Sequence, residues 1–430
     1  MVYQHVQLAS NGLIATLDLN VAELQQFVKL KSASNVKVLV AIGGPKQSSK
    51  LLSSLFVSSS QRVVTANAIL SFLTKYDLDG VDFHWQWPVL SGGNPEDRVT
   101  FPKFLQQLQL VLKPAGKILS ISVAPTKDHF LSSYDVAAID PLVDYVNVMA
   151  FDLHAFWDAQ TGHNAPVYRA VEETTRSERE LNIDFILTGW IATGISPSKI
   201  ILGVSTNGHS FRLADASVNG IRDRTVGAGP EQKYTLKSGD LNYLEACEMV
   251  REGGWTTVWD TRAQAYYTYK GTLWVSFESQ ASLEAKMNLA RSNSIGGLGM
   301  WNMEGDDVKN ICGGGRFTLL SFIASALLPA SSGTTVATST TAKTTTTTAK
   351  TTTTTAKTTT TTTTQNSNEP GGYPAYCPTS GFVRDPYDCS SFYRCTPGSK
   401  FVATGKQTCA NGLKFDTKIN VCNYAASVVC

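Results

Sequence analysis

A threonine tract constrains this 430-residue chain more than any other feature, because it divides the chain into parts that must fold separately. Between residues 331 and 370 the unit Thr-Thr-Thr-Thr-Thr-Ala-Lys repeats across Thr344–Lys350 and Thr351–Lys357. Such a segment has too few apolar side chains to bury a core. We therefore expect an extended, solvated linker that carries O-linked sugar or is a bare spacer, with folded units over 1–330 and 371–430.

Composition fits one large and one small folded unit. Apolar residues make up 42% of the chain, which is enough for a sizeable core. A net charge of +2 gives no reason to expect a nucleic-acid partner. The late apolar stretch Phe317–Leu328 is too short to cross a bilayer, so we expect a closing helix there and no membrane partner. We also expect a monomeric protein.

Before the linker, short β-branched or apolar runs alternate with longer helical patterns. This rhythm predicts parallel strands wrapped by helices, an α/β fold that comes close to the eight strands of a (β/α)8 TIM barrel. A Gly-, Tyr- and Thr-rich stretch before the last strand is too long for a simple crossover, so we expect an inserted α+β subdomain at about 207–290. The predicted strands are Met1–Leu8, Lys37–Gly44, Leu78–Trp85, Lys117–Pro125, Asp144–Asp152, Lys199–Thr206 and Gly296–Asn302.

The third of these strands carries the candidate site. Because side chains alternate along a strand, Asp82, His84 and Gln86 point to one side, while Phe83 and Trp85 point to the other. Three inward polar groups near a strand end are typical of a site, although a polar layer that satisfies itself inside a barrel would look the same.

Further motifs decide between these alternatives. Over essentially all of residues 1–330 the chain resembles the family 18 glycoside hydrolases, the chitinases and chitinase-like proteins. The family signature has Asp, Asp, Asp and Glu where this chain has Asp79, Asp82, His84 and Gln86. Three further segments are similar to the third-, sixth- and eighth-strand motifs of the family: Lys37–Gly44, Met149–Asp152 and Gly296–Trp301.

The resemblance implies a particular chemistry at the signature. In the family, a Glu protonates the leaving oxygen, the acetamide of the sugar attacks the anomeric carbon, and a neighbouring Asp orients that acetamide. Gln86 has no proton to give, and His84 replaces the orienting Asp, so the resemblance implies a degenerate site without useful turnover. The alternative is that His84 serves as the acid; a further reading makes it a neutral core histidine bonded to Asp82 or Asp152.

Sugar binding can survive the loss of catalysis, because sugar rings stack on aromatic faces. The resemblance implies substrate-binding roles for Met149, Phe151, Asp152, Trp157 and Trp301, with core packing as the alternative for the two tryptophans. Other cleft positions depart from the family: Pro45 replaces a tryptophan, Phe151 a tyrosine, and Asn207 and His209 a Tyr and an Arg. No cofactor and no metal are expected.

The N-terminus departs from the family as well. Met1–Leu8 lacks the features of a signal peptide and falls where the second barrel strand is expected. We therefore expect that the first strand of the barrel is missing and that the sequence is an N-terminally incomplete form of a secreted, extracellular protein.

Six cysteines crowd into the last part of the chain, which is typical of a disulfide framework formed in an oxidising compartment. Zinc would need closer Cys-x-x-Cys pairs. The cysteine spacing resembles the peritrophin-A chitin-binding domain, carbohydrate-binding module family 14, a small disulfide-rich β domain. The two resemblances imply these pairs: Cys377–Cys395, Cys389–Cys430 and Cys409–Cys422 in the tail, and Cys247–Cys312 in the large unit.

In so small a module, exposed aromatic rings are free to contact a polysaccharide. Tyr387, Tyr393 and Phe415 are candidates for chitin binding, although Phe415 can equally pack against the disulfides. The sequence thus favours a secreted protein that binds chitin or chito-oligosaccharides and lacks hydrolase activity. An active chitinase, or a structural chitin-matrix protein that binds through its tail only, remains an alternative.

Overall fold

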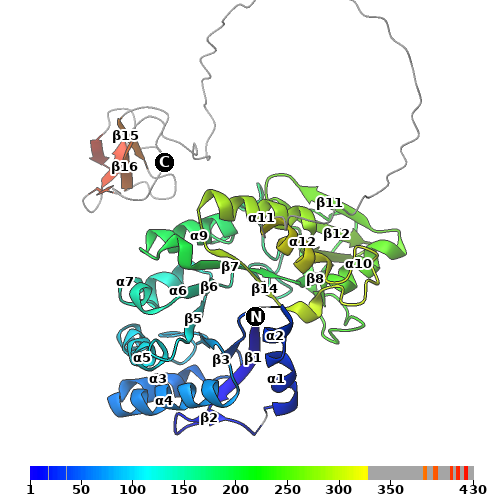
Figure 1. The fold of residues 1–430 in the computed structure, drawn as a ribbon. Helices are drawn as coiled ribbons and strands as arrows, with labels where there is room; N and C mark the ends of the chain where they lie inside the picture. Colours follow the sequence, from blue (N-terminus) through cyan, green and yellow to red (C-terminus); the bar gives the residue numbers. More distant parts are fainter. Residues whose placement is uncertain are drawn as a thin grey trace, which may run out of the picture. The chain divides into compact units, whose positions relative to one another are not determined.

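The computed structural model describes residues 1–17, 19–327, 381–384, 391–395, 407–409, 413–416 and 421–424, except Asn35. The chain separates into two compact units, Met1–Pro329 and Ala330–Cys430. Each unit is described by itself below (Figure 1).

The first unit is built on a sheet of parallel strands that follow one another in chain order, β1-β3-β4-β5-β6-β7-β14. A short strand, β2, pairs antiparallel with the end of β1. Among the described residues β14 does not pair with β1, so the strand pairing does not close into a complete barrel. The strands are β1 Val2–Leu8, β2 Ile14–Ala15, β3 Leu39–Gly43, β4 Gly80–His84, β5 Ile118–Val123, β6 Tyr145–Val148, β7 Ile200–Ser205 and β14 Gly297–Trp301.

Helices follow the strands, and Figure 1 shows α3, α4, α5, α6, α7 and α9 outside the sheet. Side-chain caps fix several of their starts: Ser48 Oγ accepts from Leu51 N, and Ser58 Oγ accepts from Gln61 N. The α-helices of this unit are α1 Val21–Val28, α2 Leu30–Ser34, α3 Ser49–Val57, α4 Ser59–Lys75, α5 Asp97–Leu112, α6 Lys127–Ser132, α7 Val136–Ile139, α8 Arg176–Arg179, α9 Ile183–Ala192, α10 Tyr243–Glu252, α11 Gln280–Ser292 and α12 Thr318–Leu327. Short 3-10 turns lie at Asp140–Leu142, Pro197–Lys199 and Met303–Gly305.

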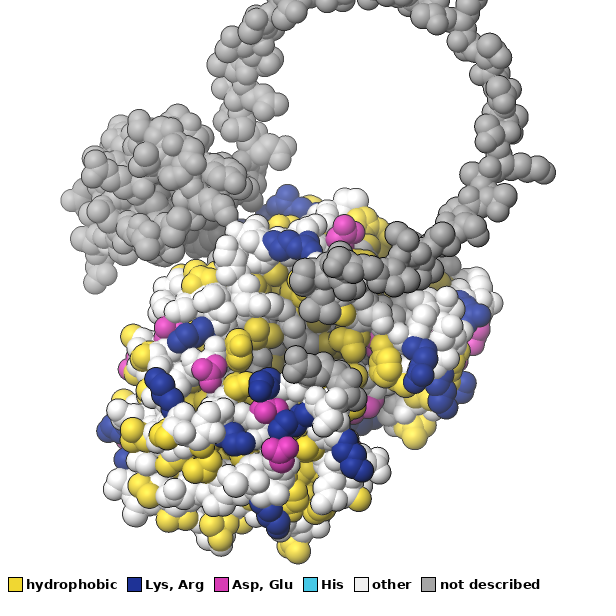
Figure 2. Space-filling view, viewed as in Figure 1, with side chains coloured by type: hydrophobic (Ala, Val, Ile, Leu, Met, Phe, Trp, Pro, Cys, Tyr) yellow, Lys and Arg dark blue, Asp and Glu magenta, His cyan; other side chains and the backbone are white. Residues whose placement is uncertain are grey.

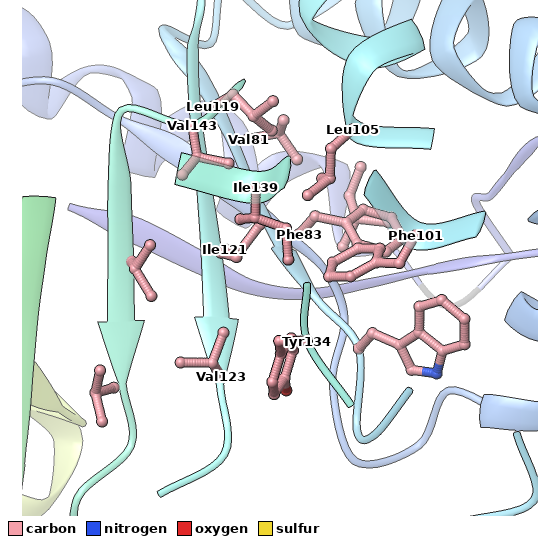
Figure 3. Close-up of a cluster of buried hydrophobic side chains, with 14 of the residues drawn as sticks. Val81, Phe83, Phe101, Leu105, Leu119, Ile121, Val123, Tyr134, Ile139 and Val143 are labelled. Carbon is pink, nitrogen blue, oxygen red and sulfur yellow. The ribbon is translucent and has the colours of Figure 1, made fainter. Parts of the chain in front are cut away.

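The largest apolar core lies between the parallel sheet and its helices (Figure 3). Phe83 and Trp85 point into this core, as the alternation predicts, where they contact Phe56 and Phe101. Phe56 also stacks on Phe104 with ring centroids 3.9 Å apart. This packing fixes the register of β4, because a shift by one residue would turn its polar side chains into the core.

The chain between β7 and α11 forms the expected inserted subdomain. Its antiparallel sheet has the order β10-β8-β13-β12-β11, with β9 on β8, and a disulfide joins Cys247 of α10 to Cys312. This is the pair that the family resemblance implies. The strands are β8 Asn207–Leu213, β9 Thr225–Ala228, β10 Asp240–Asn242, β11 Thr256–Asp260, β12 Ala265–Lys270 and β13 Leu273–Phe277.

The described part of the second unit consists of short antiparallel strands. One sheet has the order β15-β16-β17, and β18 pairs with β19. The strands are β15 Gly381–Arg384, β16 Ser391–Cys395, β17 Gln407–Thr408, β18 Leu413–Asp416 and β19 Val421–Tyr424. Cys409 is buried and disulfide-bonded. The side chains of the other tail cysteines lie outside what the structure describes, so the expected tail pairings stay predictions.

Two surface properties bear on possible partners. Within the described ranges no helix has the length and apolar character needed to span a bilayer. On the face shown in Figure 2, Lys and Arg side chains are scattered among acidic and apolar ones and do not form a continuous basic stripe.

Candidate functional site

The candidate site is a cluster of inward side chains from β1, β4 and β14. At its base, the buried carboxylate of Asp82 accepts hydrogen bonds from Ser120 Oγ at 2.7 Å, Ser122 Oγ at 2.6 Å and Asn147 Nδ2 at 2.7 Å. Burial raises the pKa of Asp82, although these three donors act in the opposite direction. Asp82 is therefore tied to the neighbouring strands β5 and β6.

His84 lies one pleat repeat above Asp82 and joins two other side chains. Its Nδ1 is 3.2 Å from His5 Nε2, and its Nε2 is 3.0 Å from the amide nitrogen of Gln86. The alternative reading of His84 as a neutral core histidine bonded to Asp82 or Asp152 is wrong about the partners, because the two ring nitrogens contact His5 and Gln86. His5 was missed, because a lone histidine on a predicted strand gives no sign of the residue it faces.

Both imidazoles are neutral at physiological pH. Burial lowers the pKa of His84 to about 4. Burial and the neighbouring His84 lower the pKa of His5 to about 4, against a smaller opposite effect of Asp82. Neither ring is an imidazolium near neutrality, so neither supplies an acidic proton to a leaving oxygen, which weakens the reading of His84 as a replacement acid.

Trp301 lies beside this pair at the end of β14. Its ring centroid is 5.5 Å from that of His5 and 5.7 Å from that of His84. Gly44 makes room for the arrangement: a Cβ at this position would come within 2.4 Å of the His5 ring. A glycine at the end of β3 is thus required for His5 to occupy the floor of the cluster.

Asp152 and Trp157 come from the long connection after β6. Asp152 Oδ1 is 2.9 Å from His209 Nε2, and Asp240 Oδ1 is 3.2 Å from His209 Nδ1. Burial would lower the pKa of His209, but the two carboxylates raise it to about 9. The imidazolium also contacts the ring of Trp157, which is 60% exposed, at a centroid distance of 5.3 Å.

A braced loop follows β4 and carries Trp87, a residue that the sequence analysis did not single out. The ring lies 6.0 Å from His84 and 5.6 Å from His129, between centroids. Ser49 Oγ donates to Trp87 O at 2.9 Å, and the buried carboxylate of Asp97 accepts from Val89 N and Asn94 N. The brace holds the chain beyond Gln86 in place.

The remaining expected residues divide between the two ends of the sheet. Asp79 does not join the cluster: it lies before β4, where it accepts from Val38 N at 2.8 Å and pairs with Lys31 at 3.4 Å. Burial raises its pKa, but Val38 and Lys31 together bring it below the usual value. Phe151 is buried, with its ring 6.2 Å from that of Trp301, and Met149 is half-buried after β6.

Two of the tail candidates, Tyr393 and Phe415, lie on strands of the second unit. Tyr393 pairs with Val383 between β16 and β15, and Phe415 pairs with Cys422 between β18 and β19. Tyr387 lies outside the described residues.

Comparison with known proteins identifies the family. The model of "Glycosyl hydrolases family 18" matches residues 1–306. The chain belongs to this family. The model of the "Chitin binding Peritrophin-A domain" matches residues 377–430, as the sequence analysis predicted.

Curated family 18 relatives include proteins of several kinds. The chain is 32% identical over 305 residues to "Probable chitinase 10" of Drosophila melanogaster, covering 69% of this chain and 13% of that protein. It is 30% identical to human "Oviduct-specific glycoprotein", covering 72% and 46%. It therefore spans less than half the length of these two relatives. It is 27% identical to mouse "Chitotriosidase-1", covering 96% and 87%.

Solved family 18 structures share the fold. The "Ostrinia furnacalis Group IV chitinase" has a TM-score of 0.73 at 31% identity, covering 76% of this chain and 90% of that one. Human YKL-39, described as "a pseudo-chitinase with retained chitooligosaccharide binding properties", has a TM-score of 0.70 at 26% identity, with 76% and 90% covered. The expected α/β fold of the family is confirmed, although the pairing of the described strands does not close the barrel.

Proposed function

We propose that this family 18 protein is a secreted, extracellular, chitin-binding protein without hydrolase activity. One observation carries the proposal: the amide of Gln86, at the position of the family's proton donor, is hydrogen-bonded to a neutral histidine. Under this proposal 1–330 is the sugar-binding unit, 331–370 a linker and 371–430 a second chitin-binding module.

The chemistry of the cluster supports this proposal. Protonation of the leaving oxygen needs a group that carries a proton near neutral pH, and such general acid catalysis typically contributes about a hundredfold to ten-thousandfold. Gln86 carries no acidic proton, and His84 and His5 hold theirs only at acidic pH. Among the described residues of the cluster, no carboxylic acid occupies the place of Gln86.

Binding is supported separately. Trp301 and Trp157 offer aromatic surface, and the half-exposed carboxylate of Asp152 is paired with the imidazolium of His209. Relatives of both kinds are similar to this chain, namely proteins titled chitinases and a protein titled a pseudo-chitinase. The two matched domains together favour chitin or chito-oligosaccharide as the ligand.

Hydrolysis assays test the absence of activity. We expect the purified full chain to release no product from a fluorogenic chito-oligomer, and Gln86→Glu combined with His84→Asp to recover measurable turnover. Gln25→Leu, an exposed position on α1, is the control. Turnover by the unaltered chain at a rate similar to that of an ordinary chitinase would overturn the proposal and favour an active chitinase.

A chitin pull-down tests which unit binds. We expect the full chain and a variant shortened to residues 1–330 both to remain on chitin beads. If the shortened, folded variant stays in the supernatant, the structural alternative holds, in which only the tail binds chitin.

A further inference from the structure

Three polar side chains form a single hydrogen-bonded chain across the floor of the site. Gln86 Nε2 lies 3.0 Å from His84 Nε2, and His84 Nδ1 lies 3.2 Å from His5 Nε2. His84 is fully buried, and among the described residues each of its ring nitrogens has one hydrogen-bond partner. The ring nitrogen that carries the proton in one imidazole therefore determines whether the next group in the chain donates or accepts a hydrogen bond.

The donors can be assigned from the amide. An amide nitrogen is only a donor, so Gln86 donates to His84 Nε2, which must be unprotonated. A neutral His84 then carries its proton on Nδ1, and this N–H donates a hydrogen bond to His5 Nε2. Within the described residues the carbonyl oxygen of Gln86 has no hydrogen-bond partner, and it is not among the buried unpaired atoms.

We propose that His5 is a positioning residue: by accepting a hydrogen bond from His84 Nδ1–H, it fixes the Gln86 amide with its nitrogen bound inside and its carbonyl oxygen offered to the sugar. The role of the sugar rests on the proposed function, whereas the orientation of the amide does not.

The surroundings of His5 support this role. It comes from β1, far in sequence from β4, and the bare Cα of Gly44 makes room for its ring. Trp301 packs against both imidazoles. Among the described residues, the carboxylate that acts on His5 is that of Asp82, which already accepts hydrogen bonds from Ser120, Ser122 and Asn147.

A fixed orientation has a consequence for recognition. A carbonyl oxygen accepts hydrogen bonds, so it can bind a sugar hydroxyl or the N–H of an acetamide. It repels the bridging glycosidic oxygen, which is itself an acceptor. The carbonyl oxygen of Gln86 would thus accept hydrogen bonds from donor groups of an N-acetylated sugar, whereas the Glu of an active enzyme donates to the bridging oxygen.

Nuclear magnetic resonance of the full chain with ¹⁵N-labelled histidine tests the orientation without any ligand. We expect His84 to show a single neutral tautomer with the proton on Nδ1. His5→Phe keeps an aromatic ring beside Trp301 but removes the acceptor, so a mixture of tautomers is expected. His5→Gln supplies a carbonyl acceptor and should restore the single tautomer.

Binding of N-acetylated chitotetraose tests the consequence. We expect His5→Phe and Gln86→Leu to weaken binding about fivefold to tenfold, which corresponds to the loss of one hydrogen bond. The affinity of His5→Gln should be closer to that of the unaltered chain. The control Gln25→Leu should bind as the unaltered chain does. The tail is identical in all variants, so differences between them report the first unit.

The outcomes separate the two proposals. A proton on Nε2 of His84 in the unaltered chain, or an unchanged tautomer and affinity in a folded His5→Phe, overturns the role of His5. If Gln86→Leu binds chitotetraose as the unaltered chain does while the Nδ1 tautomer is observed, sugar binding at this site fails and the orientation stands. Should His5→Phe not fold, His5→Gln and the unaltered chain still decide the tautomer.

Discussion

His209 Nε2 and Asp152 Oδ1 lie 2.9 Å apart, and this contact joins the inserted subdomain to the connection that carries Trp157. The carboxylates of Asp152 and Asp240 flank a ring that is almost completely buried. The same imidazolium therefore stabilises the subdomain and holds a candidate sugar-binding carboxylate in position.

This contact predicts a loss of stability in alkali. The pKa of His209 is raised to about 9, above its value of about 6.5 in an unfolded chain, so its contribution is complete below about pH 6.5 and disappears as the pH rises through 9. We expect the melting temperature of the unaltered chain to fall over this range. His209→Gln should unfold a few degrees lower at pH 6 and show a smaller fall. If the melting temperatures of the unaltered chain and of His209→Gln fell equally with rising pH, that result would contradict the ion pair.

The His5–His84 pair predicts a loss of stability in acid. Both pKa values are depressed to about 4, so the unfolded chain binds more protons between pH 6.5 and 4, and stability falls as the pH falls through this window. For His84 the shift corresponds to roughly 3 kcal/mol. The raised pKa of Asp82 has the opposite effect, since it increases stability as the pH falls. The measurement is therefore the difference in unfolding free energy between the unaltered chain and His84→Asn, followed as a function of pH. A difference that does not change with pH would refute the buried neutral pair.

The brace at Asp97 predicts a rigid loop after the site. Its carboxylate accepts from Ser53 Oγ at 2.6 Å and from the N–H groups of Val89 and Asn94. Asp97→Ala leaves these donors unpaired, and we expect a cost of about 2–4 kcal/mol with faster amide exchange at Val89. Asp128→Ala, an exposed acidic residue in the first turn of α6, is the matched control and should change stability by less than about 0.5 kcal/mol.

The disulfide between Cys247 and Cys312 closes a loop with a sequence separation of 65 residues. Loop-closure entropy predicts a loss of about 4 kcal/mol when both cysteines are replaced by Ala. Denaturant unfolding of the double variant measures this loss. Because the bridge lies outside the His84 cluster, the tautomer of His84 should stay the same; a changed tautomer would show that the bridge also shapes the site.

Local pattern alone predicted much of the molecule. The runs Lys37–Gly44 and Leu78–Trp85 predicted β3 and β4, because apolar, β-branched residues fit strands buried on both faces. Alternation along β4 predicted which side chains enter the core and which face inward, since the period of a strand is two. The order of motifs in the chain predicted the family.

Tertiary structure decided the partners of those inward residues. His5 and His84 are 79 positions apart in the chain, and only the parallel pairing of β1, β3 and β4 brings their rings together. Asp79 matches the signature but lies at the opposite end of β4, because a strand separates its two ends in space. Sequence determined that residue 86 is an amide; three-dimensional packing determined which atom of that amide is already occupied, because hydrogen-bond partners depend on distance in space and not on distance along the chain.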